Sequence, residues 1–277
     1  MGSCEQPEPA CEGSGVKPPL NAGSHSLVAV HVLWLREMKS MWRAKSRVVG
    51  TLGMPFFFLA FLGLGFQRAE IPGVPAGEYV LFLTPGIIGM TILFSSTFAG
   101  ISVIWDRQFG FLKEVMVAPV SRLSIVIGRA CGGATVSLIQ GISILFLSIP
   151  LGFRFELWAI APAIAVMCLI SFGFIGLGLI FAALMSDPHG FSLVMNFVVF
   201  PIFLLSGALF PVDALPAWLL PACYADPLTY GVDCLRCVLS PEIAKFPLLL
   251  NLSVLILFAS LTLGSSTLLF EHAEVEG

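Results

Sequence analysis

The cysteines of the carboxyl-terminal half are the first residues whose spacing could support chemistry. Cys234 and Cys237 form a C-x-x-C pair, and Cys223 lies nearby in the sequence. Thiolates at this spacing can bind zinc, but no histidine or second cysteine pair completes a metal set. We therefore expect no metal site and interpret these cysteines as small apolar residues on a helix. A disulfide between Cys223 and one of the pair stays open as the alternative.

Charged residues of the same region are the second candidates for chemistry. Asp226, Asp233 and Arg236 could serve an enzyme, yet catalysis needs polar groups that converge on one point, and these are dispersed. No lysine of the chain follows a glycine, so the phosphate-binding sequence G-x-x-x-x-G-K is absent. We expect no catalytic residues and no nucleotide site. A membrane-embedded lipid-modifying enzyme or assembly factor remains the alternative function.

A third candidate is the charged segment from Asp106 to Arg122, D-R-Q-F-G-F-L-K-E-V-M-V-A-P-V-S-R. Its apolar residues recur at helical spacing, Gly110 permits a bend, and Pro119 ends the pattern. The charged side of such a helix is expected to have no partner in this chain, which predicts docking to another protein. The residues expected to make that contact are Arg107, Phe109, Gly110, Phe111, Glu114, Met116, Pro119 and Arg122.

The elements that must position these residues are apolar. The chain of 277 residues is 57% hydrophobic and 11% charged, and its mean hydropathy is +0.95. Six stretches of 19 to 30 residues contain no Asp, Glu, Lys or Arg, and about 20 apolar residues suffice to cross a bilayer. This pattern excludes a soluble enzyme, a nucleic-acid-binding protein and an outer-membrane barrel. It predicts a membrane domain over residues 25–270 with spans at about 48–66, 79–105, 130–150, 157–185, 191–212 and 247–270.

The distribution of basic residues predicts the orientation. Of 14 Lys and Arg, ten lie in the amino-terminal region or between the second and third spans. Because basic loops stay on the cytoplasmic side, both termini of a plasma-membrane or inner-membrane protein should be cytoplasmic. We interpret residues 1–24 as a disordered tail and 271–277 as a second tail. The spans contain no acidic residue of the kind that ion-coupled carriers use, so energy should enter through a partner.

The segment 25–47 is predicted to be an amphipathic helix at the membrane interface. On a helical wheel its basic residues share one arc, and Trp34 lies on the opposite, apolar side. The basic face should contact anionic head groups or a cytoplasmic partner. The residues of that face are Arg36, Lys39, Arg43 and Arg47.

The region after the fifth span is too rich in proline for a continuous crossing helix. Irregular backbone at membrane depth must be buried by protein or reached by water, which predicts a re-entrant helical hairpin on the outer side. Asp233 and Arg236, three residues apart, are expected to form an exposed pair on it. The residues assigned to this hairpin are Pro211, Asp213, Pro216, Pro227, Asp233 and Arg236.

Three segments carry a resemblance to a known family. They are R-Q-F-G-F-L-K-E-V-M-V-A-P-V-S-R (107–122), L-L-S-G-A-L-F-P-V-D-A-L-P-A-W-L (204–219) and D-P-L-T-Y-G-V-D-C-L-R (226–236). The chain resembles ABC-2 type transporter permeases over about residues 25–270, and within them the branch that exports drugs and lipo-oligosaccharides.

The resemblance implies a membrane subunit without its own ATPase, which pairs with a second permease and binds cytoplasmic ATPase subunits. ATP and magnesium would then be held by the partner, and this chain would bind no cofactor. Residues 25–47 would form the connecting helix, residues 106–122 would contain the coupling helix, and the proline-rich region would be the re-entrant hairpin. The expected substrate is amphiphilic, drug-like or lipid-linked, exported from the cytoplasm or the inner leaflet.

Overall fold

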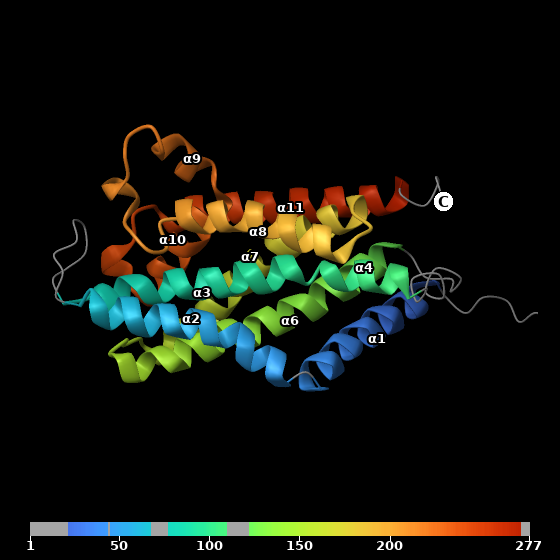
Figure 1. Cartoon of the computed structure of the whole chain (residues 1–277), viewed down its shortest axis with the longest axis horizontal. Coiled ribbons are helices and arrows are strands. Elements are labelled where there is room, and N and C mark those ends of the chain that lie inside the picture. The colour runs from blue at the N-terminus through green and yellow to red at the C-terminus, as the bar shows by residue number, and fades with distance from the viewer. Residues whose placement is uncertain (1–21, 44, 68–76, 110–121, 273–277) are drawn as a thin grey trace, which may run out of the picture.

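The computed structural model describes the chain apart from residues 1–21, 44, 68–76, 110–121 and 273–277, and Figure 1 shows its helices running largely along one axis. No strand occurs in the described residues. The long helices are α1 (Ala22–Arg43), α2 (Lys45–Gly65), α3 (Tyr79–Phe98), α6 (Arg122–Ser148), α7 (Ile160–Leu184), α8 (Pro188–Leu205) and α11 (Leu248–His272). Shorter helices are α4 (Ile101–Gln108), α9 (Leu220–Ala225), α10 (Pro227–Leu239) and the 3-10 turns η1 (Ile149–Leu151), η2 (Leu157–Ala159), η3 (Val212–Ala214) and η4 (Pro241–Ile243).

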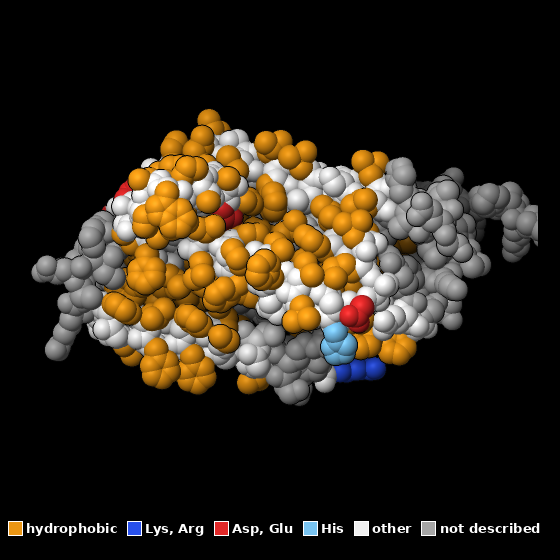
Figure 2. Space-filling model, turned by 45° about the horizontal axis from the view of Figure 1, so that its top comes forward, with side chains coloured by type: hydrophobic (Ala, Val, Ile, Leu, Met, Phe, Trp, Pro, Cys, Tyr) orange, Lys and Arg blue, Asp and Glu red, His pale blue; other side chains and the backbone are white. Residues whose placement is uncertain are grey.

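Five segments of the described chain are long and apolar enough to cross a membrane, and they contain helices α3, α6, α7, α8 and α11. A shorter apolar stretch within α2 covers Val49–Gly65. The predicted all-helical membrane architecture is therefore confirmed. The number of crossings and the depth of the outer hairpin stay predictions. Figure 2 shows one face of the molecule, on which hydrophobic side chains predominate.

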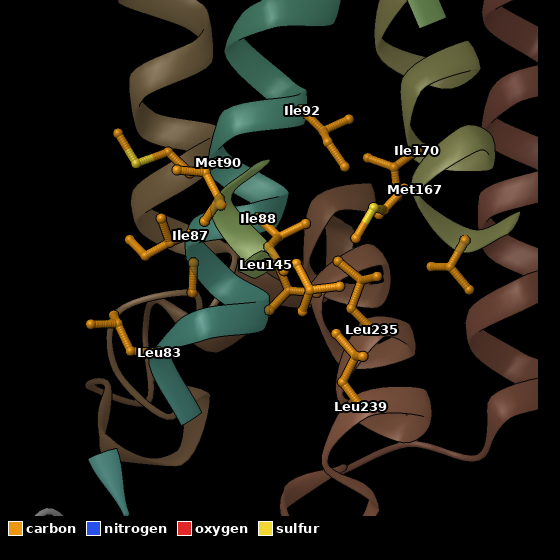
Figure 3. Packing of buried hydrophobic residues seen from close by; sticks show 14 of the residues in the cluster. Leu83, Ile87, Ile88, Met90, Ile92, Leu145, Met167, Ile170, Leu235 and Leu239 are labelled. Atoms are coloured by element: carbon orange, nitrogen blue, oxygen red, sulfur yellow. The ribbon is translucent and has the colours of Figure 1, made fainter. Parts of the chain in front are cut away.

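Helix α3 lies at the centre of the bundle and packs against α2, α6, α7, α8 and α10. Most of its side chains are buried, including the hydroxyls of Thr84 and Thr91, which donate to carbonyls one turn earlier. Figure 3 shows Leu83, Ile88 and Ile92 of α3 in one apolar cluster with side chains of α6, α7 and α10. A helix that is apolar on all sides suits this position.

Two close approaches in the bundle are possible only for glycine. A Cβ atom at Gly178 of α7 would collide with the backbone carbonyl of Thr97, and one at Gly100 would collide with the carbonyl of Gly178. A Cβ at Gly86 of α3 would meet the carbonyl of Ala208. Small residues at such positions let helix backbones come together where no hydrophobic effect drives their association. The contacts fix α3 against α7 and against the turn that follows α8.

Helix boundaries differ most from the predicted spans at three places. Helix α6 begins at Arg122, eight residues before the predicted start at 130, and α8 ends at Leu205, seven residues before 212. The predicted span 79–105 is divided into α3 and α4 at Ala99 and Gly100. The first difference arises because Arg129 interrupts the uncharged stretch although its charge is compensated inside the bundle.

Candidate functional site

A cluster of charges, buried at Asp106 and Arg129, joins three helices at the end of the bundle where α4 ends and α6 begins. Asp106, near the end of α4, has a relative exposure of only 4%, and Arg129 of α6 has 5%. Both oxygens of Asp106 accept from Arg36 of α1, one of them at 3.0 Å, and Oδ2 also accepts from Arg129. One carboxylate is therefore shared by two guanidinium groups.

The remaining contacts of Arg129 nearly complete the cluster. It donates to the Ser102 hydroxyl at 2.9 Å and lies 3.7 Å from a carboxylate oxygen of Glu37. Two arginines and two carboxylates balance the formal charge, as buried charges require. Only Nε of Arg129 is buried without a hydrogen-bond partner here. The cluster is a fixed electrostatic joint between α1, α4 and α6.

Helix α1 reaches this joint because α6 carries glycine where the two helices cross. A Cβ at Gly132 would lie 2.7 Å from Cγ of Glu37, and one at Gly128 would lie 3.1 Å from Cβ of Leu33. Trp34 donates from its indole to the Thr135 hydroxyl of α6 at 3.0 Å. Figure 1 shows α1 beside α6. The face of α1 that contains Trp34 is thus bound to protein.

Replacing Trp34 with phenylalanine should lower the free energy of unfolding by about 1 kcal/mol, because the half-buried Thr135 hydroxyl loses its donor. The matched control is Trp42→Phe, since Trp42 is 71% exposed. Thermal unfolding in mild detergent measures both variants. Equal behaviour of the two would contradict a specific contact between α1 and α6.

Most residues predicted to contact a partner lie outside the described residues. These are Gly110, Phe111, Glu114, Met116 and Pro119, and the side chains of Arg107 and Arg122 are also outside the description.

Phe109 is described, and it stands at the edge of the segment. Its side chain is 77% exposed and stacks on Trp105, with ring centroids 5.7 Å apart.

Asp106 departs from the prediction that the charged residues of this segment lack a partner in the chain, because it pairs with Arg36 and Arg129. The sequence did contain a signal for this pairing: Asp106 and Arg129 each border an apolar stretch, and charges there need partners.

The predicted basic face of the amino-terminal helix is divided. Lys39 and Arg43 are exposed on α1, whereas Arg36 turns toward Asp106. Arg47 lies on α2, because α1 ends at Arg43. A groove of about 720 Å³ lies against α1, where it is lined by Val32, Leu35, Arg36, Lys39, Ser40 and Arg43.

At the opposite end of the bundle, Asp233 and Arg236 of α10 are buried, with exposures of 3% and 5%. Asp233 accepts from the backbone amides of Lys245 and Phe246, each at 2.8 Å, and from Asn251 of α11 at 2.9 Å. The predicted exposed pair between Asp233 and Arg236 is therefore wrong. Asp233 instead accepts from two backbone amides beyond α10, groups that need an acceptor in a folded chain.

Arg236 instead binds carbonyl groups. Its guanidinium donates to Gly207 O at 2.8 Å and to Phe82 O at 3.4 Å, and it lies 3.9 Å above the centre of the Phe82 ring. Gly207 has φ +69°, a conformation that glycine adopts without strain. Arg236 thus fastens α10 to α3 and to the turn after α8.

The other residues assigned to the hairpin lie around α9 and α10. Pro227 begins α10, and Asp226 caps it by accepting from the amide of Leu228 at 2.9 Å. Burial raises the pKa of Asp226 to about 7, although the Leu228 amide and the Thr229 hydroxyl favour the carboxylate.

Asp213 lies on η3, which begins directly after Pro211, and it pairs with Lys245 at the surface. Pro216 follows η3. All five described cysteines, Cys131, Cys168, Cys223, Cys234 and Cys237, are free thiols.

Apolar crossing segments, a buried charge joint at one end and a proline-rich helical cap at the other define a multi-pass membrane protein, not a soluble or single-span one. A model of the ABC-2 type transporter family matches residues 28–240. The chain belongs to this family of transporter permeases.

Named relatives agree with the family assignment. A nodulation protein J of Rhizobium leguminosarum bv. trifolii is 30% identical over 223 residues, which cover 78% of this chain and 82% of that protein. A putative transport permease, ycf38, of Cyanophora paradoxa is 28% identical, with 74% and 72% covered. A probable doxorubicin resistance ABC transporter permease protein of Mycobacterium tuberculosis is 26% identical, with 76% of each chain covered.

Proposed function

We propose that this chain is the transmembrane subunit of an ATP-driven exporter whose ATPase is a separate cytoplasmic subunit. The observation that carries the proposal is the charge joint of Arg36, Asp106 and Arg129. This joint links α4 and α6, the two helices on either side of the segment predicted to dock on the ATPase, and connects them to α1. A movement of that segment would reach α1, α4 and α6 together. ATP and magnesium would be bound by the partner.

The proposed substrate is amphiphilic, drug-like or lipid-linked. Two observations support this proposal: the crossing helices are apolar, and the charges of the joint are paired with one another. The printed names of two relatives refer to nodulation and to doxorubicin resistance, and these activities are properties of those proteins. Transport would start from the cytoplasm or the inner leaflet, with both termini cytoplasmic.

No contact of the described residues favours the alternative function, a membrane-embedded lipid-modifying enzyme or assembly factor. Asp226 caps α10, while Asp233 and Arg236 bind backbone groups. Each of these side chains binds a structural partner, and they do not form a shared substrate site.

Charge reversal at Glu114 tests the coupling proposal. The Glu114→Lys variant should reach the membrane normally but lose substrate-stimulated ATP turnover, because a lost charge partner at an interface costs about 2 to 5 kcal/mol, more than tenfold in partner affinity. The measurement is ATP turnover of the permease reconstituted with its ATPase in liposomes, with drug-like amphiphiles as stimulants.

The matched control is Glu156→Lys, at an exposed glutamate between η1 and η2. It should leave ATP turnover unchanged. Full transport by Glu114→Lys at normal expression would remove the segment from the mechanism, and ATP hydrolysis by the permease alone would overturn the proposed division of labour.

A further inference from the structure

The groove beside helix α1 combines apolar and basic side chains. Its described lining recurs at positions 32, 35, 36, 39, 40 and 43, which is the spacing of a single helix face. Val32 and Leu35 come first along the chain, and Lys39, Ser40 and Arg43 follow toward the end of α1. The volume of about 720 Å³ lies within the range of about 300 to 1,000 Å³ for small-molecule sites. This face therefore suits a ligand with an apolar part and an anionic part.

Lys39 and Arg43 are the two cations of this face that have no counterion among the described residues. Both side chains are exposed, and neither makes an ion pair with the described part of the chain. Arg36 differs, because it belongs to the charge joint. The one acidic residue of α1, Glu37, lies 3.7 Å from Arg129 instead. Two positive charges are thus available to an anion from outside the described chain.

The contacts between α1 and α6 show the direction in which the groove runs. Leu33 lies against Gly128, and Glu37, one turn later, lies against Gly132, one turn later on α6. The two helices therefore run in the same direction. These contacts fall in the first turns of α6, where its crossing segment begins, so the later residues of α1 lie toward the bilayer.

The end of α1 is consequently at the membrane boundary. Beyond Arg43 the chain enters α2, whose apolar stretch covers Val49–Gly65. Trp42 is 71% exposed, and exposed tryptophan is typical of the level of the lipid head groups. The basic part of the groove therefore lies at the depth of lipid phosphates.

We propose that this groove binds a phospholipid with a net negative head group, and that Lys39, Ser40 and Arg43 hold its phosphate. Lysine and arginine donate charge-assisted hydrogen bonds to phosphate oxygens, and the serine hydroxyl is a further donor. A lipid is favoured over a protein anion because the two free cations lie next to the start of a crossing helix, where anionic head groups are concentrated.

Arg36 links the proposed lipid site to the charge joint. Its side chain lines the groove and is 39% exposed, while both terminal nitrogens donate to Asp106. Without a counterion, Lys39 and Arg43 repel Arg36 and disfavour the position of α1 in the joint. A bound phosphate removes this repulsion, so the lipid should stabilise the joint. In the proposed exporter, on which this step rests, the lipid should then raise coupled ATP turnover.

The first test uses the purified permease alone in mild detergent. Dioleoyl phosphatidylglycerol should raise its unfolding temperature more than dioleoyl phosphatidylcholine does. Sodium chloride at about 0.5 M should reduce the difference, because salt screens exposed charges. Inorganic phosphate should not replace the lipid, since it has no apolar chains to bind along the groove.

A double variant, Lys39→Gln with Arg43→Gln, locates the site. A basic residue near an anionic leaflet contributes about 1 kcal/mol, or about fivefold in affinity. The double variant should therefore need about 25-fold more phosphatidylglycerol for half of the effect. Lys39→Arg keeps the charge and should respond like the native chain. Arg154→Gln, at an exposed arginine between η1 and η2, is the matched control and should do the same.

Equal stabilisation by the two lipids would overturn the site, and this comparison needs no variant. An undiminished response of the double variant to phosphatidylglycerol would also overturn it. Stabilisation by inorganic phosphate to the same extent would assign the cations to a free anion and contradict the lipid.

The second test reconstitutes the permease with its ATPase in liposomes with and without phosphatidylglycerol. Substrate-stimulated ATP turnover should be higher with this lipid, and the double variant should lose the difference. Equal turnover in both liposomes, with lipid binding intact, would overturn the link between the site and the joint. Absence of stimulated turnover in every liposome would contradict the proposed exporter and leave the lipid site in place.

Discussion

The Asp106→Asn variant is expected to be about 3 to 5 kcal/mol less stable than the native chain and to lose coupled transport. The substitution keeps the shape of the side chain but removes the carboxylate that Arg36 and Arg129 share. Breaking a buried ion pair at one partner costs this much because the other charge remains buried. Glu37, 3.7 Å from Arg129, compensates only in part.

The matched control for this prediction is Asp213→Asn. Asp213 also pairs with a cation, Lys245, but its side chain is 73% exposed, so its loss should cost no more than about 1 kcal/mol. Thermal unfolding of the detergent-solubilised protein measures both variants, and ATP-driven transport in liposomes measures coupling. Similar losses in the two variants would show that the joint is no stronger than a surface pair.

The second large effect is expected for Gly178→Ala. A single methyl group at this position would collide with the Thr97 carbonyl. Both segments are helical backbone, so neither can shift locally to relieve the collision. Separating α7 from α3 should cost about 3 kcal/mol or more, the upper end of measured overpacking effects. The expected observation is a lower unfolding temperature and aggregation on size-exclusion chromatography.

Gly53→Ala is the control for this substitution, and its expected effect has the opposite sign. Apart from the neighbouring backbone of its own helix, no described atom lies within 4 Å of a Cβ at Gly53 of α2, and alanine favours helix over glycine by about 0.5 to 1 kcal/mol. This variant should therefore be as stable as the native chain or more so. A loss of stability in both variants would indicate that general helix properties, not the contact with Thr97, decide the outcome.

The crossing helices could be predicted from the sequence because hydrocarbon imposes one requirement on every residue of a span. Long uncharged stretches meet this requirement whatever the neighbouring helices are, so they can be recognised from the sequence alone. Five of them correspond to crossing candidates in the structure. Boundaries are less predictable, as α6 shows. Its first turns contain Arg129, and the pairing with Asp106, 23 residues earlier, helps to make a charge acceptable there.

The polar contacts of the site could not be predicted for a related reason. A helical wheel placed Arg36 with Lys39 and Arg43 on one basic face, but it contains no information on what the neighbouring helix offers. Glycines at 128 and 132 allow α1 to approach α6 until Arg36 reaches Asp106. Similarly, the spacing of Asp233 and Arg236 suggested that they pair with each other. The carboxylate of Asp233 instead accepts from the backbone amides of Lys245 and Phe246, which lie 12 and 13 residues further along the chain.

The contact between Asp106 and Arg129 also bears on how such permeases can diverge. It fastens α4 to α6 on either side of the intervening segment, so the distance between the two ends of that segment is set by the bundle. The pair therefore holds α4 to α6 independently of the intervening segment. If residues 110–121 dock on an ATPase as proposed, exchanging them for the matching segment of a relative should leave the folding of the membrane scaffold unchanged.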